Sequence, residues 1–145
     1  MKFKKLIQPL NFKDINTTSN YLTSIKQRSH TIAVLPEFMN NEIKEDFNFI
    51  YNNENFALKG EIALWRAVIL QAAVDLASKS KKRIAQTYRW KAFQWFNLNN
   101  EEFITVCNYA GLDPKYVYER IRDKKDEAVE FMTDVINNAK SLREV

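Results

Sequence analysis

The segment 61–78, EIALWRAVILQAAVDLAS, restricts the fold more than any other part of the chain. Written as a helix it is apolar nearly all the way round, so it has no face suited to water and other elements have to cover it. Its apolar part, 62–77, is too short to cross a bilayer and is interrupted by Arg66, Gln71 and Asp75. The segment therefore predicts a central buried helix in a domain that does not span a membrane.

Glycine and proline are scarce, which limits the class of fold around this helix. The 145 residues include 2 glycines and 3 prolines, while 46% of them are hydrophobic. With so few turn-forming residues, a sandwich or barrel of short strands is disfavoured. The length is that of one domain with a sizeable core. We therefore expect one compact all-α domain over residues 1–145, with the basic segment 1–14 as a flexible arm.

Apolar residues recur at helical spacing along most of the chain, which predicts a multi-helix domain. The segment 31–35, TIAVL, favours extended structure, but no other segment offers a partner strand. We therefore interpret it as a buried connector rather than a strand. The expected helices are 17–29, 40–52, 61–78, 81–96, 99 or 100 to 110, 113–123 and an amphipathic last helix at 125–142.

The N-terminus and the cysteine content indicate a cytoplasmic protein. The opening MKFKKLIQPL has a basic start, but its apolar stretch is only Leu6 and Ile7, which is too short for a secretory signal. One cysteine excludes an internal disulfide and a four-cysteine zinc site, and one histidine excludes a histidine-rich metal site. We expect a reduced thiol, no metal and no cofactor.

The segment 101–123 has the pattern of two short helices joined by a turn that begins with glycine. Helices that cross steeply need a small residue where they meet, and Cys107 lies four residues before Gly111. Gly111 occupies the position where a left-handed backbone is required. The side chains expected to pack inward are Val106, Ala110, Leu112, Val117 and Ile121.

The second helix of this pair is expected to present cations and aromatic rings on its outer side. The outward positions are Lys115, Tyr116, Tyr118, Glu119 and Arg122, and such side chains reach phosphates or base edges. A helix–glycine–helix corner also occurs in bundles that bind no DNA, and segment 113–127 carries five acids against five bases. A corner with a purely architectural function therefore stays open as an alternative.

The segment FITVCNYAGLDPKYVYERIR resembles the helix-turn-helix of DNA-binding proteins. It departs from the usual pattern at Cys107, where alanine is common, and at Arg120, where a small or apolar residue is common. Together with Trp65 and Trp95, the pattern over 61–122 is similar to small prophage-borne helical proteins of bacteria. That resemblance implies a phage or mobile-element context and supplies no catalytic residues.

A second basic region lies between Lys79 and Lys91, where six cations occur without an acid. Tyr88, Trp90 and Trp95 alternate with these cations, and cations with aromatic rings suit nucleic acid. The expected phosphate contacts are Lys81, Lys82, Arg83, Arg89 and Lys91. The alternative is a solvated basic face whose apolar side chains, Ile84, Tyr88, Phe93 and Trp95, belong to the core.

The sequence does not favour an enzyme. His30 is the single histidine and lies in an expected loop, while Cys107 is expected to be buried, so no nucleophile–base pair is apparent. Glu101 and Glu102 are adjacent on a helix and point about 100° apart, which does not converge on a metal. Two glycines do not supply a phosphate-binding loop.

Two functional hypotheses follow. The first is a small protein that binds double-stranded DNA through 101–123, with a regulatory or phage-related function, and that forms a homodimer through 125–142, where Phe131, Met132, Val135 and Leu142 align. The net charge of +4 permits this partner without requiring it. The second is a protein-interaction or oligomerisation module, inhibitor-like or antitoxin-like, that uses the acidic region 37–61, of net charge −4, or the basic region 79–91.

Overall fold

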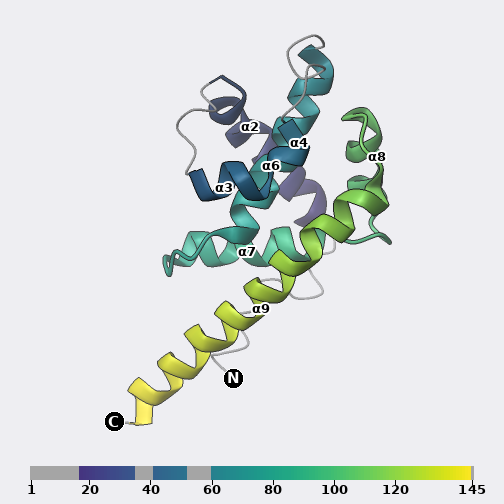
Figure 1. Ribbon diagram of the computed structural model, residues 1–145. Coiled ribbons are helices and arrows are strands. Elements are labelled where there is room, and N and C mark those ends of the chain that lie inside the picture. The colour runs from purple at the N-terminus through teal and green to yellow at the C-terminus, as the bar shows by residue number, and fades with distance from the viewer. Residues whose placement is uncertain (1–16, 35–40, 52–59, 145) are drawn as a thin grey trace.

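The computed structural model describes residues 17–34, 41–51 and 60–144 (Figure 1). Within these ranges every regular element is a helix, so the prediction of an all-α fold is confirmed. None of the described helices is long and apolar enough to cross a membrane. The expected arm at 1–14 lies outside the described residues. The helices are α2 (Thr17–Val34), α3 (Asn41–Asp46), α4 (Asn48–Tyr51), α6 (Gly60–Ala77), α7 (Arg83–Trp95), α8 (Glu101–Tyr109) and α9 (Pro114–Glu144).

Helix α6 forms the centre of the domain, as its apolar circumference predicts. It contacts α2, α4, α7, α8 and α9. Nearly all of its side chains from Arg66 to Leu76 are buried. Figure 1 shows α6 passing through the middle of the molecule, with α7 below it and α9 extending diagonally away from the body. The other helices pack around α6, which is how an isolated all-apolar helix becomes stable in water.

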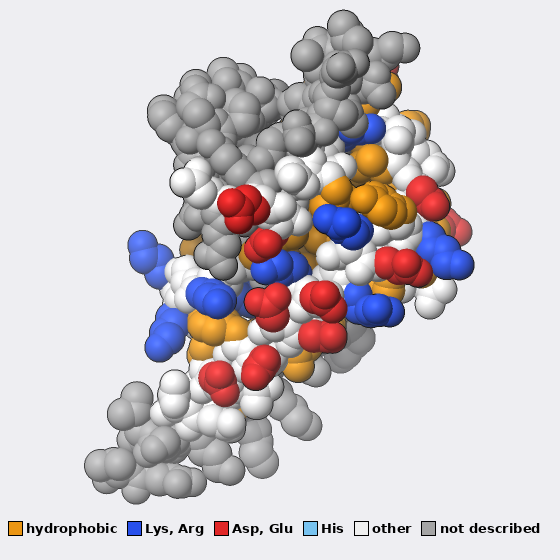
Figure 2. Space-filling model, viewed as in Figure 1, with side chains coloured by type: hydrophobic (Ala, Val, Ile, Leu, Met, Phe, Trp, Pro, Cys, Tyr) orange, Lys and Arg blue, Asp and Glu red, His pale blue; other side chains and the backbone are white. Residues whose placement is uncertain are grey.

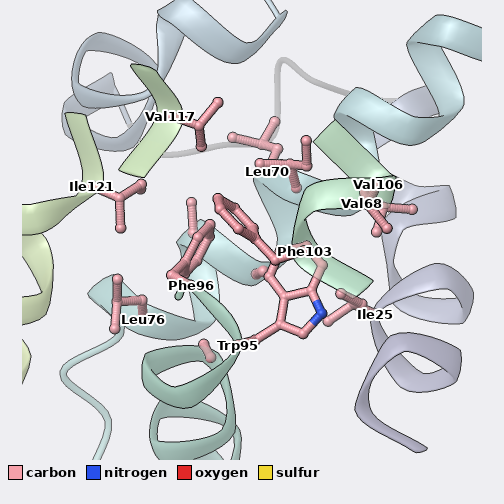
Figure 3. Packing of buried hydrophobic residues seen from close by; sticks show 14 of the residues in the cluster. Ile25, Val68, Leu70, Leu76, Trp95, Phe96, Phe103, Val106, Val117 and Ile121 are labelled. Atoms are coloured by element: carbon pink, nitrogen blue, oxygen red, sulfur yellow. The ribbon is translucent and has the colours of Figure 1, made fainter. Parts of the chain in front are cut away.

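An aromatic cluster joins α7 and α8 to α6. Trp95, Phe96 and Phe103 are fully buried and meet edge to face, with centroid separations of 5.3 to 5.6 Å. Figure 3 shows these three rings pointing toward one another, with aliphatic side chains from α2, α6, α8 and α9 around them. Edge-to-face pairs contribute about 1 kcal/mol each beyond the burial of area.

A buried polar cluster centred on Asp75 fixes α2 against α6. The carboxylate of Asp75 accepts hydrogen bonds from the Tyr21 hydroxyl at 2.6 Å, from Arg28 at 2.8 and 2.9 Å, and from Gln71 at 3.2 Å. Burial, and then the charge of Asp75, raise the pKa of Tyr21 well above its usual value. Burial alone would lower the pKa of Arg28, but its bonds to Asp75 raise it overall. Every strong acceptor site of Asp75 is therefore occupied within the fold.

The connector expected at 31–35 is wrong, because α2 continues to Val34. The β-branched residues of this run favour extended structure only when a sheet is there to receive them. Among the described residues no strand exists, and α2 packs along α6 instead. Residues 31–34 are therefore helical despite their local preference.

The two C-terminal helices expected at 113–123 and 125–142 are one helix, α9, of 31 residues. No glycine or proline follows Pro114, so nothing interrupts the hydrogen bonding of the helix near 124. Lys124 pairs with Asp46 at 2.8 Å and with Glu127 at 3.4 Å, while Lys125 donates to the Phe96 carbonyl oxygen at 2.8 Å. The bonds to Asp46 and Phe96 hold α9 to the body at the position where a break was expected, while the pair with Glu127 lies within α9.

The weak helix expected at 40–52 is present as two short helices, α3 and α4, on either side of Phe47. Phe47 and Ile50 are buried, as their spacing predicts. The remaining predicted helices are confirmed to within a few residues, since α6, α7 and α8 correspond to 61–78, 81–96 and 100–110.

Candidate nucleic-acid interface

The corner between α8 and α9 is formed by two helix caps and by Gly111, whose left-handed backbone the sequence predicts. The side chain of Asn100 caps α8 by accepting from the Glu102 amide at 2.9 Å. Gly111 ends the helix with φ of 70°, and the Leu112 amide donates to the Cys107 carbonyl at 2.9 Å. Asp113 then caps α9 by accepting from the Lys115 amide at 3.1 Å. Each helix end is therefore closed by its own residues.

The inner side of the corner is fully packed. Val106, Cys107, Ala110, Val117 and Ile121 have exposed fractions of 2% or less. Burial, with a smaller contribution from the charge of Asp113, raises the pKa of Cys107 to about 12. The thiol therefore stays protonated at neutral pH and is no nucleophile. The burial of these side chains fixes which side of α9 faces solvent.

Arg66 of α6 supports the corner by binding the end of α8, a contact that the sequence does not predict. Its Nε donates to the carbonyl oxygen of Ala110 at 2.8 Å, and only 4% of the residue is exposed. The guanidinium thus meets the negative end of the α8 dipole. Burial lowers the pKa of Arg66. Beside it, Trp65 packs on Tyr109 with a centroid separation of 5.2 Å. An arginine within a mostly apolar helix was the available signal.

Three of the four predicted contact residues on α9 face solvent. Lys115, Tyr116 and Arg122 are exposed, and the Tyr116 ring meets Phe49 of α4 edge to face at 5.8 Å. Arg120 is also exposed, and its guanidinium lies 4.9 Å from the Phe49 ring centroid.

Tyr118, the fourth of these residues, is half-buried against the core. The ammonium of Lys125 lies 5.2 Å from its ring centroid. Tyr118 therefore presents less of its ring to a ligand than Tyr116 does.

The basic run at 79–91 divides into exposed and buried members. Lys81, Lys82 and Arg83 are exposed, together with Lys79. Lys91 is half-buried. The four exposed cations are grouped at the N-terminal end of α7 and in the loop before it, and the first turn of α7 contains no acid.

Arg89 is wholly buried, and the structure does not place it among the surface cations. Its Nε and Nη2 donate to the carbonyl oxygens of Ser78 and Ser80 at 2.7 and 2.6 Å. Its guanidinium lies 4.6 Å from the Phe131 ring centroid, and burial lowers its pKa. Arg89 therefore holds the loop before α7 and is not free to bind a phosphate.

The aromatic residues in and after this run also contact other side chains of the protein. Trp95 belongs to the core and donates to Glu102 at 3.0 Å, while the Tyr88 ring lies 3.8 Å beneath the Arg28 guanidinium. Trp90 stacks on Phe93 with a centroid separation of 5.6 Å. Ile84, which the alternative interpretation assigned to the core, is 63% exposed.

The exposed cations form two groups that lie toward opposite ends of α7. One group precedes and begins α7, and the other lies on the first turns of α9. Helix α9 runs antiparallel to α7, because Lys125 reaches Phe96 whereas Phe131 lies beneath Arg89. The span of α7, 13 residues, is about 20 Å. Figure 2 shows acidic side chains gathered along α9 between basic side chains on either side. The exposed acids of this stretch are Asp123, Asp126, Glu127, Glu130 and Asp134.

Some of the α9 side chains that were expected to form a dimer interface pack against the core of their own chain instead. Ala128 and Met132 belong to the core cluster, and Phe131 and Val135 are half-buried. The side chain of Leu142 lies outside the described residues. Val129 is the large apolar residue of this stretch that is well exposed, at 44%.

Within the described ranges, no three His, Cys, Asp or Glu side chains are grouped as metal ligands. His30 belongs to α2, but its side chain is not among those described. No protein family, no curated protein and no solved structure matches this chain.

Proposed function

We propose that this protein binds double-stranded DNA through the first turns of α9. The observation that carries the proposal is the phase of this helix: Val117 and Ile121 are buried in the corner, which leaves Lys115 and Arg122 on the solvent side. Lys115 and Arg122 are two helical turns apart, or about 10 Å. That spacing suits contacts to neighbouring phosphates or base edges along a groove.

The exposed cations at the start of α7 would make a second contact. Lys81, Lys82 and Arg83 can neutralise phosphates without reading sequence. Because the acidic side chains of α9 lie between the two groups, one straight duplex would not touch both without meeting those acids. We therefore assign the α7 group to a separate or bent part of the DNA.

The test is fluorescence anisotropy of a labelled random-sequence duplex against the intact protein across a salt series. We expect an affinity that falls steeply with salt, since each phosphate contact contributes about −0.9 to the slope of log K against log salt. The double variant Lys115→Gln/Arg122→Gln should lower the magnitude of the slope by about 2. The matched variant Lys81→Gln/Lys82→Gln removes the same charge at the other group.

The comparison of these two variants tests the assignment as well as the activity. A loss that is confined to the α7 variant would overturn the assignment to α9. A folded wild-type protein that does not bind even at low salt would overturn DNA binding altogether, and the corner would then be architectural.

The acidic side chains on α9 favour a second candidate, a protein-interaction module. Five exposed acids between Asp123 and Asp134 repel a polyanion and attract a basic surface. Charge reversal by Lys81→Glu/Lys82→Glu separates the candidates. Loss of DNA binding supports the first, whereas loss of self-association in sedimentation, with DNA binding absent throughout, supports the second.

A further inference from the structure

We propose that a groove between α2 and α6 is a binding site for a small aromatic anion. The groove has a volume of about 330 Å³ and is lined by Thr23, Lys26, Gln27, Leu64, Trp65 and Val68. This volume lies at the lower end of the range for sites that hold small organic ligands. All of the lining side chains come from two consecutive turns of each helix, so the rigid packing of α2 on α6 forms the site.

The lining determines which chemistry fits. Leu64, Trp65 and Val68 supply an apolar wall on α6, and Leu64 is 38% exposed. Lys26 and Gln27 of α2 face them, and both are exposed. The lining contains one cation and no acid. An apolar wall with an aromatic ring opposite a single cation is complementary to a flat ring that carries a carboxylate.

Lys26 already occupies the position that such a ligand would take. Its ammonium lies 5.2 Å from the centroid of the Trp65 ring. It forms no ion pair with the described residues, so an incoming carboxylate would not have to displace an acid. The lysine side chain is long and exposed, and its ammonium can follow the anion while the ligand ring stacks on Trp65.

The groove is connected to the corner by two adjacent residues of α6. Trp65, which lines the groove, also packs on Tyr109 at the end of α8. The next residue, Arg66, holds the Ala110 carbonyl oxygen. A ligand stacked on Trp65 therefore contacts α6 next to the residues that bind the end of α8 and orient the start of α9. This coupling rests on the proposed function, whereas the binding site does not.

The binding test uses three matched probes: 2-naphthoate, the neutral 2-naphthalenemethanol and the cationic 2-naphthylmethylamine. Each is titrated into the intact protein and followed by calorimetry and by the indole N–H signals of the three tryptophans in proton–nitrogen NMR spectra. For a ligand of this size we expect a Kd on the order of 1 mM or tighter for naphthoate. The cation should bind several-fold more weakly, and the Trp65 signal should shift while that of Trp95 does not.

Two variants locate the site. Lys26→Gln should reduce the affinity for naphthoate to that for the neutral probe and leave the neutral probe unchanged. Lys79→Gln, an exposed lysine on the loop before α7, is the matched control and should change neither. Both positions are exposed, so both variants should fold, which circular dichroism checks.

The proposal is overturned if naphthoate does not bind saturably, if all three probes bind equally, or if the shifts appear at Trp90 or Trp95 instead of Trp65. The coupling is tested separately, by repeating the DNA titration with saturating naphthoate. A changed DNA affinity that disappears in Lys26→Gln supports the coupling. An unchanged affinity refutes the coupling alone, because probe binding is measured without DNA.

Discussion

The α8–α9 corner and the segment 79–95, which covers the loop before α7 and α7 itself, both present cations beside aromatic rings in the sequence, but they differ in which of these side chains the fold leaves exposed. In the corner, Gly111 and the buried pair Val117 and Ile121 fix the phase of α9, and the cations expected outside are outside. In the segment 79–95, the central cation Arg89 and the ring of Trp95 are buried. A turn residue with its packed neighbours thus predicts orientation, whereas a run of charges alone does not.

The largest expected effect comes from removing the buried arginine. Arg89→Ala leaves the carbonyl oxygens of Ser78 and Ser80 without their donor and opens a cavity beneath Phe131. We expect a loss of about 3 kcal/mol in the free energy of unfolding, measured by urea titration. Lys82→Ala, from the same run but exposed, is the control and should change it little. Equal effects of the two substitutions would contradict the division of this run.

A smaller effect is expected from the glycine of the corner. Gly111 has φ of 70°, and a Cβ there would meet nothing closer than the Arg66 guanidinium at 3.7 Å. Gly111→Ala should therefore cost only the backbone term, about 1 to 2 kcal/mol, in the same urea titration. Gly111→Asn should cost less, because asparagine adopts this conformation more readily. If alanine and asparagine cost the same, the left-handed backbone is not the reason for glycine at this position.

Alkaline pH should destabilise the corner through Cys107. Burial raises its pKa to about 12 from an ordinary value of 9.0, so the folded state holds the proton more tightly than the unfolded state. The contribution of the protonated thiol to the free energy of unfolding is complete below pH 9 and is lost as the pH rises toward 12. At pH 10 the loss is about 1 kcal/mol. Urea titrations between pH 8 and 10.5 should show this slope.

Cys107→Ala supplies the control for that slope. The variant lacks the thiol, so its stability should fall less over the same pH interval. Tyr21, whose pKa is raised by burial and by Asp75, adds a loss above pH 10 in both proteins. Identical slopes below pH 10 would mean that the thiol does not titrate with unfolding.

The smallest effect is expected at Ile84, where helical spacing favoured the core but the residue is 63% exposed. Ile84→Thr should change the free energy of unfolding by no more than about 0.5 kcal/mol. Ala92→Thr, at a buried position of the same helix, should cost more because the added atoms have no space. A large loss at Ile84 would show that this end of α7 is covered in solution.

Much of the fold follows from the sequence because local signals there agree with one another. Asn100, Gly111 and Asp113 mark helix ends by their own backbone chemistry, and the structure has those ends. The missed features depend on partners distant in the chain. Lys125 donates to the Phe96 carbonyl oxygen and holds the middle of α9 to the body, and Thr31–Val34 continues α2, which packs along α6. The absence of glycine and proline after Pro114 permits a continuous α9, but no local pattern contains these distant contacts.

The candidate site divides in the same way. Lys115, Tyr116 and Arg122 were predicted to be exposed from their spacing relative to Val117 and Ile121, and they are exposed. The burial of Arg89 and the bond from Arg66 to Ala110 were not predicted. Both arginines donate to backbone carbonyl oxygens rather than to acids. Since every residue has a backbone carbonyl, the sequence contains no specific partner from which their burial could be predicted.

Because α9 is continuous, the corner lies at one end of a single long helix. A single helix of 31 residues is about 47 Å long. The bond from Lys125 to Phe96 and the burial of Ala128 and Met132 anchor the middle of this helix to the body, so the helix is fixed between its two ends. The chain thus joins its candidate contact surface to a distant point through one continuous helix.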